Sequence, residues 1–129
     1  MNYEDMSDFE INTKVALIKY QGLIQLESEG DGVFVSRVDD KYDFVNIVHS
    51  NFNPCNNPSD AWLIIVENAI SIQPVHYVAA GGYYKLSEIK YWTAWATNRQ
   101  SVDSFTEDKN PLRAAMICFL KMKDAENER

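Results

Sequence analysis

The chain has 129 residues, of which 46% are hydrophobic, 12% aromatic and 24% charged, a composition typical of folded rather than disordered proteins. Its 19 acidic and 12 basic residues give a formal net charge of -7, which argues against a protein that coats the phosphates of duplex nucleic acid. No apolar run approaches the ~20 residues needed to cross a membrane, and two cysteines with no signal peptide ahead of them indicate a cytoplasmic protein with free thiols.

The length and the lack of a linker predict one domain over residues 1–129. Its first predicted element is a helix that begins after Ser7, because Ser7 and Glu10 have the spacing of a capping box. We expect this helix to continue to about Leu17. The β-branched residues in this region leave a strand possible from about Val15 onward.

Three extended segments follow and predict an antiparallel meander of three strands. They are Leu23–Leu26, Val33–Val38 and Tyr42–Val48. The first connection contains Asp31-Gly32 between β-branched residues, which is a hairpin signal because glycine tolerates the positive φ of tight turns. Asp39–Lys41 forms the second turn.

The dipeptide Asn57-Pro58 predicts the start of a second helix, since Asn caps helices and Pro fits the first helical position. We expect this helix to extend from Pro58 to about Ile70. The six consecutive apolar residues Ala61–Val66 would place apolar side chains on every side of it. Such a helix must be covered from more than one direction.

The remaining chain predicts further strands and a last helix. Ser71–Ala80 is extended, Gly81-Gly82 breaks the pattern, and Tyr91–Thr97 alternates large side chains as a central or interface strand does. A second Asn-Pro pair starts a helix from Pro111 to about Lys123, apolar on more than one face. The predicted fold is α+β, an antiparallel sheet packed by about three helices. We expect a homo-oligomer to cover the excess apolar surface.

The start of the last helix carries two cations, Lys109 and Arg113, around the cap Asn110. A helix N-terminus already has partial positive charge, so cations there are unfavourable unless an anion is bound. Free amides, Lys109 and Arg113 would together suit a phosphate or carboxylate. The structural alternative is that Glu107 and Asp108, just upstream, neutralise both cations.

Aromatic residues gather in the strand region before this helix and suggest a stacking surface for a flat ring. The candidates are Tyr84, Trp92 and Trp95, followed by Arg99. Stacking on aromatic side chains is worth ~1–3 kcal/mol per base. The alternative is that these residues are core or interface residues, as aromatic residues at strand spacing usually are.

No catalytic residue and no metal site are predicted. The only histidines, His49 and His76, belong to no recognisable motif, and no nucleophile elbow or phosphate loop is present. Those two histidines and the cysteines Cys55 and Cys118 show no useful metal-ligand spacing. We expect no cofactor.

Three blocks of sequence carry a resemblance to a known family. They are Ser7–Asn12, Pro54–Trp62 with the following Ile64–Asn68 and Ile70–Ile72, and Lys109–Ile117, whereas Gln21–Ser50 shows no matching pattern. In these blocks the chain resembles the NinX-type proteins of lambdoid bacteriophages. The resemblance implies a phage or prophage accessory protein that works in the bacterial cytoplasm, and it implies no biochemical activity.

The leading functional hypothesis is a non-enzymatic homo-oligomer that sequesters a small, anionic, nucleotide-derived host molecule. In it Arg113 and Lys109 hold the phosphate, and an aromatic residue packs against the ring. A second hypothesis is an acidic adaptor or inhibitor that binds a host protein. A third is a nucleotide hydrolase with His49 or His76 as the base, which the scarcity of acid–base residues disfavours.

Overall fold

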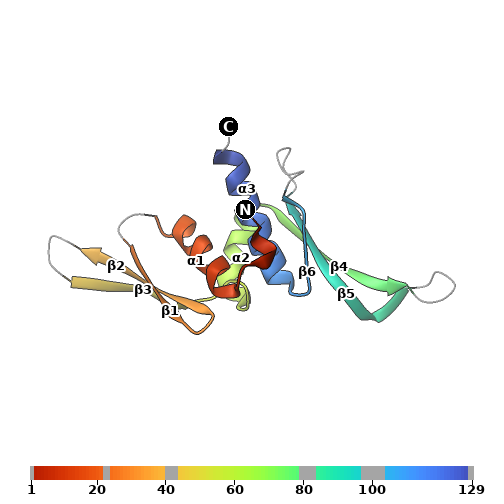
Figure 1. The fold of residues 1–129 in the computed structure, drawn as a ribbon, viewed down its shortest axis with the longest axis horizontal. Coiled ribbons are helices and arrows are strands. Elements are labelled where there is room, and N and C mark those ends of the chain that lie inside the picture. The colour runs from red at the N-terminus through yellow and green to blue at the C-terminus, as the bar shows by residue number, and fades with distance from the viewer. Residues whose placement is uncertain (1, 22–23, 40–43, 79–83, 97–103, 128–129) are drawn as a thin grey trace.

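The last helix, α3 (Pro111–Asn127), lies at the centre of the protein, and the two other α-helices and the later strands pack against it (Figure 1). The computed structural model describes residues 2–21, 24–39, 44–78, 84–96 and 104–127. Helices α1 (Asp8–Lys19) and α2 (Pro58–Glu67) both pack against α3, and a short 3-10 helix, Tyr3–Asp5, precedes α1. None of the described helices is long and apolar enough to cross a membrane.

The first sheet is the predicted meander. Strands β1 (Ile24–Glu29), β2 (Gly32–Asp39) and β3 (Phe44–Phe52) pair antiparallel in that order. Gly30 makes the turn between β1 and β2 with φ of +62°, a conformation that glycine adopts without steric cost. The hairpin prediction is therefore confirmed.

The second sheet is built from the later strands. Strands β4 (Ile70–Val78), β5 (Tyr84–Ala96) and β6 (Thr106–Asp108) pair antiparallel, with β5 in the middle. The prediction of a central strand at Tyr91–Thr97 is confirmed for its described residues. Gly81-Gly82 and Thr97 lie outside the described residues. Strand β6 was not predicted, because three residues of sequence Thr-Glu-Asp carry no strand pattern.

The α+β class with three helices is confirmed, and its strands form two sheets. In the described part of the chain the strands β1–β3 hydrogen-bond only among themselves, and so do β4–β6. Helix α2 connects β3 to β4 and carries the chain from one side of α3 to the other (Figure 1). The sheets therefore project from opposite sides of the helical centre as two arms.

The helix boundaries differ from prediction at their C-terminal ends. Helix α1 continues to Lys19, so the helical interpretation holds over the strand alternative from Val15 onward. Helix α2 ends at Glu67, before the predicted Ile70, because Ala69 takes a left-handed conformation with φ of 52°. Helix α3 extends past Lys123 to Asn127.

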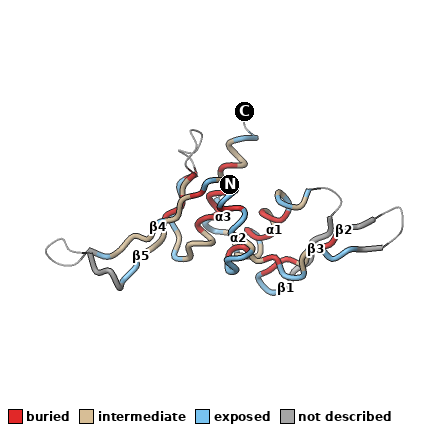
Figure 2. Tube along the Cα trace, turned by 180° about the vertical axis from the view of Figure 1, so that it is seen from behind, coloured by how far each residue is buried: buried red, intermediate tan, exposed pale blue. Residues whose placement is uncertain are grey.

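The hydrophobic core is concentrated around α3 (Figure 2). Every residue from Ala114 to Leu120 is buried, which means that α3 is covered on all sides within one chain. Its cover comes from the strands β4, β5 and β6 and from the helices α1 and α2. The apolar surface of α3 therefore needs no second copy of the protein.

Truncation of this core tests its contribution to stability. Ile117 is fully buried, so Ile117→Ala should lower the free energy of unfolding by about 2–5 kcal/mol through lost apolar contacts and the cavity it leaves. The measurement is equilibrium urea unfolding followed by circular dichroism. Leu17→Ala is the control, because Leu17 is 54% exposed and its truncation should change stability by no more than about 0.5 kcal/mol. Equal losses for both variants would contradict this assignment of the core.

Candidate functional site

The three sequence blocks that carry the family resemblance meet in one place. They contribute most of the side chains of a hydrogen-bonded cluster, which we call the polar junction, between the start of α1, the loop before α2 and the start of α3. Its members carry carboxylate, amide or guanidinium groups. They are Asp8, Asn12, Asn53, Asn56, Asp108, Asn110 and Arg113.

Arg113 is the charged centre of the polar junction. Its Nε donates to Asp108 Oδ2 at 3.0 Å and its Nη1 to Asp8 Oδ1 at 2.7 Å. Its Nη2 donates to the carbonyl of Met6 at 2.6 Å and lies near two further carbonyls of the same N-terminal segment. Burial works to lower the pKa of Arg113, but the hydrogen bond with Asp8 and the charge of Asp108 outweigh it, so the pKa is raised.

Two asparagines bind both backbone polar groups of one residue, Cys55, in the loop before α2. Asn12, which is fully buried, accepts a hydrogen bond from the amide of Cys55 at 3.0 Å. Asn110 Nδ2 donates to the carbonyl of Cys55 at 2.7 Å. The Nδ2 group of Asn12 also donates to the carbonyl of Asp31 and to Asn53 Oδ1. The loop is therefore fixed between α1 and α3, and the buried amides are satisfied.

The predicted cap of α3 is confirmed, and it uses the donors that an anion would need. Asn110 Oδ1 accepts hydrogen bonds from the amides of Leu112 at 2.9 Å and Arg113 at 3.3 Å. The amide of Ala114 donates to the carbonyl of Asn110. With the guanidinium held by Asp8 and Asp108, the cation at this helix start is neutralised by the chain itself.

The sequence also allowed that the acidic residues just upstream neutralise the two cations at this helix start, and this is confirmed for one of them. Asp108 pairs with Arg113, as the sequence suggested, whereas Lys109 is exposed. The second carboxylate belongs to Asp8, 105 residues away in the chain, which sequence reasoning missed. The sequence carried only an indirect signal for this pairing, which is that Asp8 and Arg113 both lie in blocks that carry the family resemblance.

Trp92 and Trp95, the two aromatic candidates whose side chains the structure describes, do not share one face of β5. Trp92 and Trp95 are half-buried, and their odd spacing places them on opposite faces of β5. Trp92 is the β5 residue that pairs with Asp108 of β6, so its backbone lies beside the polar junction. Tyr84 begins β5, roughly 25 Å along the strand from Trp92. Its side chain and all of Arg99 lie outside the described residues.

The two histidines lie on different sheets and do not come together. His49 in β3 has both ring nitrogens engaged, Nε2 with Asp60 Oδ1 at 2.8 Å and Nδ1 with the amide of Asn51 at 3.0 Å. His76 in β4 has a buried Nδ1 with no hydrogen-bond partner among the described residues. The described residues also contain no group of three histidines, cysteines or acids that could hold a metal ion.

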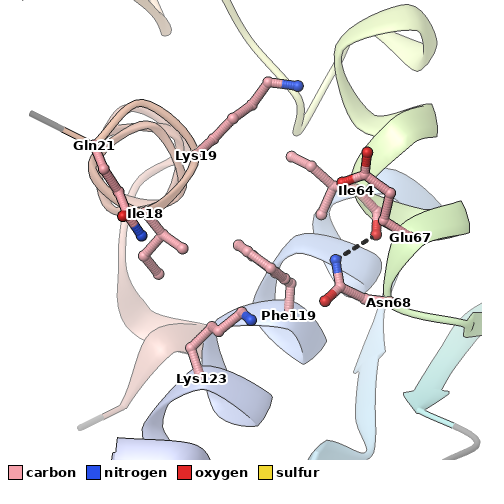
Figure 3. A pocket seen from close by; sticks show the side chains of 8 residues that line it. All are labelled: Ile18, Lys19, Gln21, Ile64, Glu67, Asn68, Phe119 and Lys123. Carbon is pink, nitrogen blue, oxygen red and sulfur yellow. Dashed lines mark hydrogen bonds between the residues drawn. The ribbon is translucent and has the colours of Figure 1, made fainter.

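A cleft of about 270 Å³ lies where the three helices meet (Figure 3). Lys19 from α1 and Lys123 from α3 stand on its rim, above a floor that includes Phe119. Glu67 lines the same cleft, and Lys123 pairs with Glu126 at 3.2 Å. The C-terminal ends of α1 and α2, which carry partial negative charge, also converge there. The lysines therefore balance local negative charge, and the cleft is a poor site for an anion.

Helix α2 leaves a large apolar surface uncovered. Its inner face, Ala61, Ile64 and Ile65, is buried. Its opposite face exposes Trp62 to 63%, Leu63 to 54% and Val66 to 54%, and with the exposed Ser59 these positions follow the spacing i, i+3, i+4, i+7. We call these four residues the outer stripe. The sequence predicted that α2 needs cover from more than one direction, and the outer stripe is the face that still lacks it among the described residues.

The fold and these surfaces define a small α+β protein whose partly buried charges and amides tie its helices together. A family model described as Bacteriophage P22, NinX matches residues 2–123, and the chain belongs to this family. The match confirms the resemblance and includes the segment Gln21–Ser50, where the sequence pattern was unclear. No curated protein and no solved structure shows significant similarity to the chain. The family places the protein among phage proteins of unknown function, and the ligand-binding roles expected for its candidate residues stay predictions.

Removal of the central cation tests whether the polar junction is structural. Arg113→Ala removes the cation that pairs with two partly buried carboxylates and donates to the carbonyl of Met6, so it should lower the free energy of unfolding by about 3 kcal/mol. Lys109→Ala removes an exposed cation four residues away and should change stability by no more than about 0.5 kcal/mol. Thermal and urea unfolding measure both effects. A stable Arg113→Ala protein would show that the junction does not hold the helices together.

The thiols provide a test of packing at the junction and in α3. Cys55 and Cys118 are both free and fully buried. Burial raises the pKa of Cys55 and raises that of Cys118 to about 11, so neither thiolate should form near neutral pH. An aromatic disulfide reagent at about pH 8 should modify neither cysteine in the folded protein and both after unfolding in urea. Rapid reaction of the folded protein would contradict this.

Proposed function

We propose that this phage protein is a non-enzymatic binding protein that docks another protein chain through the outer stripe of α2. The observation that supports the proposal is Trp62, which is 63% exposed on a helix whose other face is already buried in the core. Tryptophan is enriched at the energetic centres of protein interfaces, because it buries a large area at small entropic cost. Its neighbours Leu63 and Val66 extend the same apolar surface.

The size of this surface supports a contact rather than an isolated exposed residue. Trp62 alone leaves on the order of 150 Å² accessible to solvent. Val66 lies four positions after Trp62 and three after Leu63, so it neighbours both and the three side chains are contiguous. Contiguous apolar surface on a soluble protein usually marks an interaction site.

An enzymatic role has less support. Both ring nitrogens of His49 are engaged, and the buried Nδ1 of His76 has no hydrogen-bond partner among the described residues to orient the ring. A hydrolase would need a base with a free nitrogen and a group to orient it.

Sequestration of a small nucleotide-derived anion also has less support than protein docking. Arg113, which would hold the phosphate, is 12% exposed and already bound to Asp8 and Asp108. A phosphate would have to displace one of these carboxylates. A thermal-shift measurement against a panel of nucleotides and cyclic dinucleotides separates the two roles, because a docking protein should show no shift for any of them.

Site-specific photocrosslinking tests the docking role directly. Trp62→p-benzoylphenylalanine places a photoreactive group in the outer stripe, and Leu17→p-benzoylphenylalanine places it at a control position that is 54% exposed on α1. After irradiation of expressing bacteria, position 62 should give a discrete covalent protein adduct and position 17 should not. The absence of an adduct specific to position 62 would contradict the proposed function.

A further inference from the structure

We propose that the occupant of the outer stripe is a second copy of this chain, packed so that the two α2 helices run antiparallel about a two-fold axis. This inference rests on the proposed function and names the partner of the same site. Three observations support it: the spacing of the stripe, its lack of charge and the charges at its two ends.

The spacing makes the stripe complementary to itself. In an antiparallel crossing centred between Trp62 and Leu63, each Trp62 meets the other copy's Leu63, and each Ser59 meets the other copy's Val66. Ser59 is small, so the helices can approach closely at the ends of the contact. The same side chains thus supply both halves of the interface, as a two-fold contact requires.

The charge of the protein limits where two copies can meet. With a formal net charge of -7, most of the surface repels a second copy at low salt. The outer stripe contains no charged residue. Asp60, the one acidic residue in the first turn of α2, has a side chain only 9% exposed and is paired with His49.

The ends of α2 select the antiparallel orientation. Glu67 is the last residue of α2, and the helix begins at Pro58, where the peptide dipoles place partial positive charge. An antiparallel pair brings Glu67 of each copy beside the positive end of the other α2. A parallel pair would bring the two Glu67 carboxylates together, which is unfavourable.

The area of the stripe predicts a weak, reversible dimer. Three side chains supply on the order of 300 Å² per copy, against about 800 Å² per partner in a standard stable interface. Dimerisation should therefore depend on protein concentration within the range that sedimentation experiments reach.

Sedimentation velocity of the purified 129-residue chain, from about 10 to about 500 µM, tests this inference. The average mass should rise with concentration from that of the 14.8 kDa chain towards that of a dimer. Leu63→Ser should raise the midpoint concentration at least tenfold. Leu17→Ser is the matched control, because Leu17 is also a helical leucine exposed to 54%, and it should associate as the wild type does.

Cysteine crosslinking tests whether the outer stripe lies in the dimer interface. The two native thiols are buried, so Leu63→Cys adds one accessible thiol close to the expected two-fold axis. Mild oxidation should convert Leu63→Cys, but not Leu17→Cys, to a covalent dimer. A chain that stays monomeric throughout, or a dimer that Leu63→Ser leaves unchanged, overturns the inference. If position 62 then crosslinks to a host protein in cells, the proposed docking function still stands; if it gives no adduct, both are wrong.

Discussion

The neutralisation of one guanidinium is the interaction on which the rest of this structure depends. Arg113 stands in the first turn of the central helix, where the peptide dipoles already place positive charge, and it is largely withdrawn from solvent. Asp8 at the start of α1 and Asp108 at the end of β6 compensate it, and the N-terminal segment adds its carbonyls. A single side chain thus fixes the first helix, the last strand and the last helix relative to one another.

The amide contacts around Cys55 complete this arrangement. Asn12 accepts from the amide of Cys55 and Asn110 donates to its carbonyl, so the loop that leads into α2 is fixed between α1 and α3. Buried amides of this kind must be paired, because an unpaired one costs about 1–3 kcal/mol. The arrangement therefore favours one packing of the helices over its alternatives.

Local signals were read correctly from the sequence, and long-range pairings were not. Ser7 and Asn110 cap their helices as predicted, because a cap depends on a few adjacent residues. The unusual cation at Arg113 was noticed, but its main partner Asp8 depends on the folded chain and leaves no local pattern. The division into two sheets was missed for the same reason, since alternation predicts strands without saying which strands pair.

The distance along the chain between contacting residues also bears on how the protein folds. The hairpins β1–β2 and β4–β5 join neighbouring segments and can form early, because closing a short loop costs little entropy. The contact between Asp8 and Arg113 closes a loop of nearly the whole chain. The helices at the centre cannot pack together until α3 has been synthesised. On the ribosome the hairpins of the two sheets can therefore form before α3, the helix between the two sheets, is available.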